Sequence, residues 1–350
     1  MPSAVVFGTP GTPDVLRWSA VAPLSPGPDD VVIAVAAAGV NNADLLQRRG
    51  RYPVPRDAPA VLGLECAGTI TAVGSGVTEW SVGDPVCALL DGGGYADEVA
   101  VRAGQVMPVP TGLSILEAAA IPEVACTVYS NLAMIAGVTA GRSVLIHGAG
   151  GGIGTFAVQW CTAIGADVIA TAGSAAKASA SVELGARVAI NYREEDFVTA
   201  TKAATGGRGV DAILDVVGAP YLARNIECLS ADGHLVILGG SMEPTELDLG
   251  VLMTKRASVT STMLRSRPAD QKATIVAGVI RDVLPLFASG VFRVVVDTVI
   301  PLRDAAKAHK LLESRGTVGK VILDNSDQST STQSRVRSMA LRHPAYPADR

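Results

Sequence analysis

The chain has 350 residues, of which 48% are hydrophobic, 18% charged and 4% aromatic. This composition is typical of a soluble globular protein and excludes a fibrous or largely disordered chain, and the length predicts about two domains. The formal net charge of −4 gives no basic field for duplex nucleic acid or anionic lipid, so we expect no nucleic-acid partner and no membrane partner.

The N-terminal segment shows no leader pattern, because it lacks a basic region followed by a long apolar stretch, and no run of about 18 apolar residues follows. We therefore predict a cytoplasmic protein. The five cysteines are odd in number, widely spaced and set among apolar neighbours. This pattern favours reduced thiols in the core over disulfides.

The first part of the chain is rich in short predicted strands. Apolar runs at 31–38, 67–73, 82–90 and 95–101 are separated by Gly, Pro and Asp. After Ala118, short apolar runs alternate with helical segments, which predicts βαβ units and a parallel sheet. The clearest strands are Ser143–His147, Val168–Ala172, Ala212–Val216 and Leu235–Leu238, with helices near 152–164, 175–184 and 220–229.

The end of the chain is predicted to return to the first part. Val291–Val299 and Val318–Leu323 have the pattern of strands, which indicates a first domain split by the second. The last residues are rich in Ser, Thr, Gln and Arg and predict a flexible tail. The expected boundaries are 1–122 for the first part of the split domain, 123–266 for the parallel-sheet domain, 267–325 for the return and 326–350 for the tail.

A strand, a glycine-rich turn and a helix follow one another from Ser143 to Trp160. The turn aligns as Ala149-x-Gly151-x-x-Gly154, which is the dinucleotide fingerprint with alanine in place of its first glycine. Gly151 would let the backbone approach a pyrophosphate, Gly154 would let the helix pack on the strand, and the helix N-terminus would face the phosphate. The strand before and the helix after favour a nucleotide site over a tight turn without a ligand.

The end of the second predicted strand carries no acid. An NAD-selective fold places Asp or Glu there to hold the ribose hydroxyl groups, whereas this chain has Gly173, Ser174 and Lys177. A hydroxyl and an ammonium group suit a 2′-phosphate, which predicts NADPH rather than NADH. The alternative is that Ser174 is an ordinary helix N-cap and Lys177 a solvated helix residue.

Several motifs together carry a family resemblance: Asn41-Asn-Ala-Asp44, Gln47-Arg-Arg-Gly-Arg-Tyr-Pro53, Gly63-Leu-Glu65, Ala118-Ala-Ala-Ile-Pro-Glu123, Leu264-Arg-Ser-Arg267 and Gly319-Lys320. With them the chain resembles the zinc-free quinone oxidoreductases of the medium-chain dehydrogenase/reductase superfamily, and among these the p53-inducible branch. The resemblance implies an α/β fold in which a GroES-like β-rich catalytic domain is split by a Rossmann domain with a doubly wound parallel sheet. It further implies NADPH in the cleft between the domains and a homodimer joined through an edge strand such as Ser258–Met263.

The resemblance also implies the site residues. Tyr52 and Asn41 are the expected catalytic residues: the Tyr52 hydroxyl would donate to the anion that develops on the acceptor, and Asn41 would orient ribose or substrate. The alternative for Tyr52 is an aromatic residue in a loop at the rim. The expected cofactor-binding residues are Asn41, Thr127, Gly151, Gly152, Ile153, Ser174, Lys177, Tyr192, Leu264 and Lys320.

No metal site is expected. Zinc-dependent relatives hold zinc through a Cys in the segment that matches Asn41–Asp44 and a His in a Gly-His-Glu motif, whereas this chain has no Cys there and reads Gly63-Leu-Glu65. The third zinc ligand of these relatives is a Cys or an acid, and Glu123 is the one candidate near the matching place. A single carboxylate cannot hold zinc by itself. No group of four cysteines for a structural zinc follows Cys87. We therefore predict NADPH as the cofactor and no zinc.

The predicted activity is that of an NADPH:quinone oxidoreductase acting on a small-molecule acceptor. Without a metal to polarise a carbonyl, hydride transfer requires an acceptor that is already electron-poor, such as a quinone. One alternative is an NADPH-dependent reductase of activated carbon–carbon double bonds in an enone or enoyl thioester. A second alternative is a protein that binds NADPH without catalysis.

Overall fold

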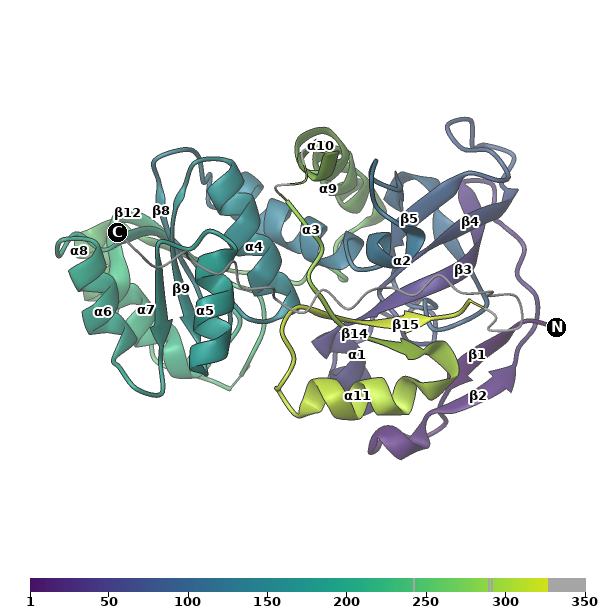
Figure 1. The fold of residues 1–350 in the computed structure, drawn as a ribbon, viewed down its shortest axis with the longest axis horizontal. Coiled ribbons are helices and arrows are strands. Elements are labelled where there is room, and N and C mark those ends of the chain that lie inside the picture. Colours follow the sequence, from purple (N-terminus) through teal and green to yellow (C-terminus); the bar gives the residue numbers. More distant parts are fainter. Residues whose placement is uncertain (242, 289, 291, 327–350) are drawn as a thin grey trace, which may run out of the picture.

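The computed structural model describes residues 1–241, 243–288, 290 and 292–326. Figure 1 shows two lobes side by side, with a mixed sheet at the side of the N-terminus and a parallel sheet in the other lobe. Of the predicted tail, residues 327–350 lie outside the described residues. Within the described ranges, no helix has both the length and the apolar character needed to cross a bilayer.

The lobe at the N-terminal side is built on a seven-stranded sheet in the order β14-β15-β3-β4-β5-β7, with β6 also paired to β3. A separate antiparallel pair, β1 and β2, precedes it. The strands of this lobe are β1 (Ser3–Val6), β2 (Arg17–Ala20), β3 (Asp30–Val40), β4 (Glu65–Val73), β5 (Pro85–Leu89), β6 (Glu98–Arg102), β7 (Val106–Pro108), β14 (Val296–Pro301) and β15 (Lys320–Asp324). Its helices are α1 (Asn42–Arg48), α2 (Ile115–Ala118) and α11 (Ala305–Glu313).

The last two strands complete this first sheet. β15 pairs antiparallel with β3, with Val321 opposite Val40, and β14 pairs parallel with β15. The chain therefore returns to its first part, as expected; the strand begins at Val296, and Val291, where the predicted strand starts, lies outside the described residues. The domain boundaries at residues 122 and 266 stay a prediction.

The second lobe is a six-stranded, all-parallel sheet in the order β10-β9-β8-β11-β12-β13. This is the doubly wound order, which changes direction between β8 and β11. The predicted Rossmann arrangement is confirmed. The strands are β8 (Ser143–Ile146), β9 (Asp167–Ala172), β10 (Val188–Asn191), β11 (Val210–Asp215), β12 (Leu229–Ile237) and the edge strand β13 (Ser258–Ser261), and the helices are α4 (Gly152–Ala163), α5 (Ala175–Glu183), α6 (Phe197–Ala204), α7 (Leu222–Cys228) and α8 (Leu249–Lys255).

Both faces of the parallel sheet are buried, which explains its continuous apolar strands. In β8, Val144 and Ile146 belong to the core cluster that contains Phe156 of α4, whereas Leu145 points to the opposite face and the cluster that contains Phe197 of α6. The first of these clusters continues through α3 (Pro122–Val128) to β5 and β7 of the other lobe. One hydrophobic core therefore spans the boundary between the lobes.

A helical group covers this shared core. It comprises α3, a π-helical turn at Tyr129–Ile135, α9 (Ala269–Asp282) and α10 (Leu284–Ala288). Gly278 of α9 lies against the Tyr129 ring, where a Cβ atom would come within 2.3 Å of Cε1. The five cysteines are free and buried, which confirms the prediction of reduced core thiols.

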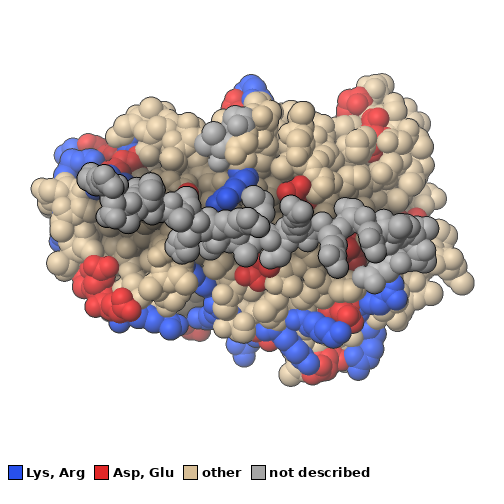
Figure 2. Space-filling model, in the orientation of Figure 1, with Lys and Arg blue, Asp and Glu red and all other residues tan. Residues whose placement is uncertain are grey.

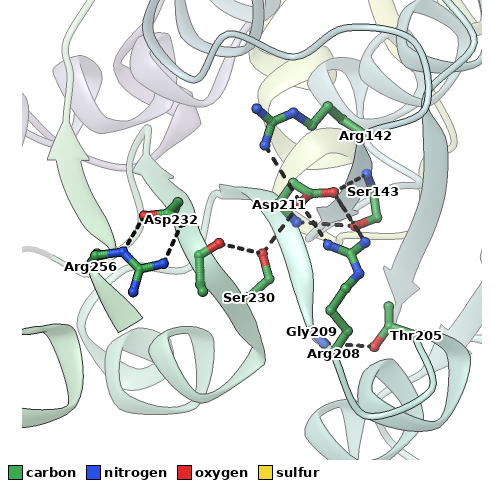
Figure 3. Close-up of polar contacts among 10 residues, drawn as sticks. Arg142, Ser143, Thr205, Arg208, Gly209, Asp211, Ser230, Asp232 and Arg256 are labelled. Carbon is green, nitrogen blue, oxygen red and sulfur yellow. Dashed lines mark hydrogen bonds and ion pairs between the residues drawn. The ribbon is translucent and has the colours of Figure 1, made fainter. Parts of the chain in front are cut away.

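A cluster of charged side chains links the first residues of β8 and β11 through hydrogen bonds and ion pairs (Figure 3). Asp211 accepts hydrogen bonds from the backbone and hydroxyl of Ser143 at 2.7 and 2.8 Å and from Arg208 at 2.8 Å, and Arg142 lies 3.7 Å away. The cluster lies at the amino ends of the strands, opposite the edge at which ligands bind in such sheets. Its role is structural. Figure 2 shows acidic and basic side chains interspersed over one face of the molecule, without one continuous field of either sign.

Candidate functional site

The candidate site lies where the glycine-rich turn after β8 meets β15. Gly151 has an extended conformation as the N-cap of α4. The Gly319 backbone N–H donates to the Gly150 carbonyl at 2.9 Å, and Gly151 and Gly319 form an isolated β-bridge. Because β15 belongs to the other sheet, the turn lies at the boundary between the lobes, beside the point where the strand order reverses.

The glycines of this turn have different surroundings. A Cβ atom on Gly154 would lie 2.4 Å from the Gly148 carbonyl oxygen and the Ala149 Cα, so only glycine allows α4 to lie this close to the turn. A Cβ on Gly151 would meet nothing closer than 3.5 Å. This contrast agrees with the predicted roles, because Gly154 serves packing and Gly151 leaves space in front of the helix N-terminus.

Two lysines lie on either side of the turn. A Cβ on Gly150 would come within 2.9 Å of the side chain of Lys177 from α5, and one on Gly152 within 2.5 Å of the side chain of Lys320 from β15. The Lys177 ammonium donates to the Arg315 carbonyl at 2.6 Å, and burial lowers the pKa of Lys177. Two cationic side chains therefore flank the N-terminus of α4.

The residues predicted to recognise a 2′-phosphate gather at the ends of β9 and β10. Ser174 caps α5, and its hydroxyl accepts the Lys177 backbone N–H at 3.4 Å. Tyr192 is 41% exposed, and its hydroxyl lies 2.5 Å from the position of a Cβ on Gly173. Asp167 lies at the opposite end of β9 and pairs with Arg187 at 2.6 Å. No acid from β9 therefore reaches this group.

On the side of the mixed sheet, Asn41 and Lys320 both form hydrogen bonds with the carboxylate of Glu65, a residue that was not predicted to belong to the site. The Lys320 ammonium donates to Oε1 of Glu65 at 2.5 Å and to Oδ1 of Asn41 at 2.7 Å, and the Asn41 amide donates to the same Glu65 oxygen at 2.9 Å. Glu65 is fully buried. An acid inside a buried strand requires a partner, and this requirement was the available signal for a role of Glu65.

Tyr52 is half-buried and lies near Arg265 and Glu123, two more residues that were not predicted to belong to the site. The Arg265 guanidinium carbon is 5.5 Å from the Tyr52 ring centroid. Burial, followed by the charge of Glu123, raises the pKa of Tyr52 to about 12, so the phenol keeps its proton and acts as a donor. The Glu123 backbone N–H donates to Oε2 of Glu65 at 2.9 Å, which joins this group to the Lys320 cluster.

The remaining predicted residues lie nearby with contacts of their own. Thr127 is buried in α3, where its carbonyl accepts from the Asn131 amide at 2.7 Å. Ile153 is half-buried in the first turn of α4, and Leu264 is buried in the shared core. Their contacts to a cofactor stay predictions. Within the ranges that the structure describes, no group of three or more His, Cys, Asp or Glu residues could hold a metal ion.

Comparisons with known proteins agree with this architecture. Residues 27–111 match the alcohol dehydrogenase GroES-like domain, and residues 152–289 match the family described as zinc-binding dehydrogenase. Quinone oxidoreductase 1 of Escherichia coli K12 is 35% identical over 328 residues, which cover 92% of this chain and 99% of that protein. A 2-haloacrylate reductase of a Burkholderia species is 33% identical over 336 residues, with the same coverage.

Among solved structures, Escherichia coli quinone oxidoreductase complexed with NADPH matches with a TM-score of 0.81 and 33% identity, over 92% of this chain and 99% of that one. Membership of the p53-inducible branch stays a prediction. The two domain matches, the strand order and the full-length relatives agree with one another. The chain therefore belongs to the quinone oxidoreductase family of the medium-chain dehydrogenase/reductase superfamily, with a GroES-like domain and a Rossmann domain.

Proposed function

We propose that this protein is an NADPH-dependent, zinc-independent oxidoreductase that reduces quinones. The observation that carries the proposal is the open Gly151 position between Lys177 and Lys320, at the N-terminus of α4. This arrangement offers helix N–H groups to a pyrophosphate and places the Lys177 ammonium nearby for a 2′-phosphate, while Lys320 is bound to Glu65 and Asn41. A structure of an Escherichia coli relative contains NADPH, which supports the same cofactor for this chain.

The residues present fit a nucleotide with a 2′-phosphate. Ser174, Lys177 and Tyr192 would hold that phosphate, and no acid from β9 opposes it. The first residues of α4, Gly152 and Ile153, would present backbone N–H groups to the pyrophosphate. When bound, the nicotinamide supplies hydride to an acceptor.

The mixed-sheet side of the cleft would hold the acceptor. The Tyr52 hydroxyl, which stays protonated, would donate a hydrogen bond to the oxygen on which negative charge develops. Asn41, fixed by Lys320 and Glu65, would orient ribose or substrate. The zinc-ligand positions of related dehydrogenases lack Cys and His here, so the acceptor itself must be electron-poor.

A second candidate function is the reduction of an activated carbon–carbon double bond. The relative named 2-haloacrylate reductase favours it, because a 2-haloacrylate carries a double bond conjugated with a carboxylate. The same hydride would then add to the β-carbon of an enone or enoyl thioester rather than to a quinone.

The test is the oxidation of NADPH by the purified protein after dialysis against a chelator. A small ortho-quinone and an enone of similar size are compared as acceptors through kcat/KM. We expect turnover of the quinone well above the enzyme-free rate. A higher kcat/KM for the enone would favour the second candidate, whereas tight NADPH binding without turnover of either acceptor would favour a binding protein.

A further inference from the structure

Glu123 occupies an unusual position between the two halves of the site. It lies in the first turn of α3, and its backbone N–H is bonded to Glu65. The next residue, Val124, lines a small cavity together with Gly152 of the glycine-rich turn and Lys320 of β15. The charges of Glu65 and Lys320 both act on the Glu123 carboxyl group, so this group lies near the mixed-sheet side of the site.

The Glu123 carboxyl group is half-buried and has no hydrogen bond or ion pair within the part of the chain that the structure describes. The nearby cations have other partners. Lys320 has three donors and uses them on Val40, Asn41 and Glu65. Arg265 donates to the Asp91 carbonyl at 2.8 Å and to the Gln47 amide oxygen at 2.6 Å.

The charges around Glu123 favour its neutral form. Burial, followed by the charge of Glu65, raises the pKa of Glu123 to about 8. Asp44 acts in the same direction, and Lys320 and Arg265 act against it. The titratable and charged groups that act on it or respond to it are Asp44 of α1, Glu65 of β4, Lys320 of β15, Arg265 after β13, Tyr52 and, on its own helix, Cys126.

Glu123 and Tyr52 thus have complementary properties. Tyr52 can donate a hydrogen bond but holds its proton firmly, because burial and the charge of Glu123 raise its pKa. Glu123 carries a proton near neutral pH that it can release and recover. The two groups interact electrostatically on the side of the cleft where the acceptor is expected.

Building on the proposed function, we propose that Glu123 is the proton donor that completes reduction of the acceptor. The acceptor gains an electron pair and one hydrogen as hydride from the nicotinamide, which is oxidised, and negative charge develops on the acceptor. The O–H bond of Glu123 then breaks as a new bond to that proton forms, on oxygen for a quinone or on the α-carbon for an enone. Water returns a proton to the carboxylate.

The test compares wild type with Glu123→Gln and Glu123→Asp, and with Glu246→Gln as an exposed control. We expect Glu123→Gln to lower kcat by about 10²-fold, at the low end of what proton transfer contributes, and to abolish the fall of kcat above about pH 8. Glu123→Asp should restore part of kcat, and Glu246→Gln should match wild type. The Kd for NADPH should not change in any of the variants.

Two further readouts separate proton donation from a structural role. Tyr52→Phe should lower kcat yet keep the pH dependence of wild type. In the protein without nucleotide, infrared spectroscopy should show a protonated carboxyl band that titrates near pH 8 and is missing in Glu123→Gln. Asp44 and Asp215, each with a pKa raised to about 6, would titrate lower.

The outcomes are distinguishable. Active wild type together with a Glu123→Gln variant of equal kcat and unchanged pH profile would overturn the assignment and leave the proposed function intact. A Glu123 carboxyl that is ionised at pH 7 would overturn it as well, even if Glu123→Gln does not fold. Wild type that reduces neither acceptor would contradict the proposed function and, with it, the role of Glu123.

Discussion

At the scale of single residues, the two lysines of the site differ in their hydrogen-bond partners, and we expect this difference to decide their roles. Lys320 is saturated by three acceptors, which suits it to fixing Asn41 and Glu65. Lys177 is different, because among the described residues its ammonium group donates only to the Arg315 carbonyl. We therefore expect Lys177 to exchange that contact for a phosphate group.

Replacing Lys177 tests its assignment to the 2′-phosphate. A charge-assisted hydrogen bond contributes about 1.5–3 kcal/mol, so Lys177→Ala should raise the KM for NADPH by roughly 10-fold to 100-fold. The KM for NADH should change little, and Lys177→Arg should retain most of the preference for NADPH. Equal effects of Lys177→Ala on both nucleotides would refute the assignment.

The sequence indicated the nucleotide side of the site better than the acceptor side. Ser174 and Lys177 follow a recognisable strand at a short, fixed spacing, so local pattern predicted that both lie at the end of β9, and the geometry of the α5 N-cap agrees with this. Their contact with a nucleotide stays a prediction. Glu65 and Glu123 come together through backbone and side-chain contacts across 58 residues. Arg48 is buried against His309, which lies 261 residues away, and no local pattern reveals such a contact.

At the scale of elements, the strand–turn–helix unit from β8 to α4 positions the site. The apolar runs predicted the strands of the parallel sheet well, because both faces of that sheet are buried. The predicted strand included residues 292–295, which precede the start of β14 at Val296, since an apolar run alone does not show where pairing with β15 starts. The edge strand β13 also ends at Ser261, before the predicted Met263.

Two glycine substitutions in the turn should affect different properties, one the stability of the fold and the other the binding of NADPH. Gly154→Ala would force backbone atoms apart and should destabilise the fold by about 1–3 kcal/mol, as overpacking does. Gly151→Ala meets only an ordinary contact and should leave thermal stability nearly unchanged, yet weaken NADPH binding by narrowing the approach of the pyrophosphate. Urea unfolding and nucleotide fluorescence measure the two effects. Unaltered NADPH binding by a folded Gly151→Ala variant would contradict the placement of the pyrophosphate.

The Asp211 cluster of Figure 3 should contribute to stability in a pH-dependent way. Burial opposes ionisation of Asp211, but hydrogen bonds from Arg208 and Ser143 outweigh it and lower its pKa from 3.8 to about 2. The native state therefore binds fewer protons than the unfolded state, and the stabilisation is full above about pH 4 and lost as the pH falls toward 2.

Asp211→Asn should lower the free energy of unfolding at pH 7 by about 1–3 kcal/mol and reduce its fall in acid. The matched control is Asp232→Asn, because Asp232 pairs with Arg256 while both side chains are 64% exposed. An exposed pair contributes about 0–1 kcal/mol. Urea unfolding at pH 7 and pH 3 measures both variants, and equal losses in the two would show that burial of Asp211 does not matter.

At the scale of the whole molecule, the return of the chain to its first sheet brings residues from distant parts of the sequence together at the boundary between the lobes. The Gly319 N–H donates to the Gly150 carbonyl, and Lys320 pairs with Glu65 of β4, so the candidate site contains residues from both lobes. The homodimer through the β13 edge and the cytoplasmic location stay predictions. We propose that these residues support hydride transfer from NADPH to an electron-poor acceptor without a metal.

Metal-free hydride transfer is tested with NADPH that carries deuterium at the transferred position and with an enone acceptor, whose product retains the label on carbon. The protein is first dialysed against a chelator and its metal content is measured. We predict a product labelled with one deuterium, formed at the same rate before and after chelation. An unlabelled product, or activity that chelation abolishes and zinc restores, would contradict the account.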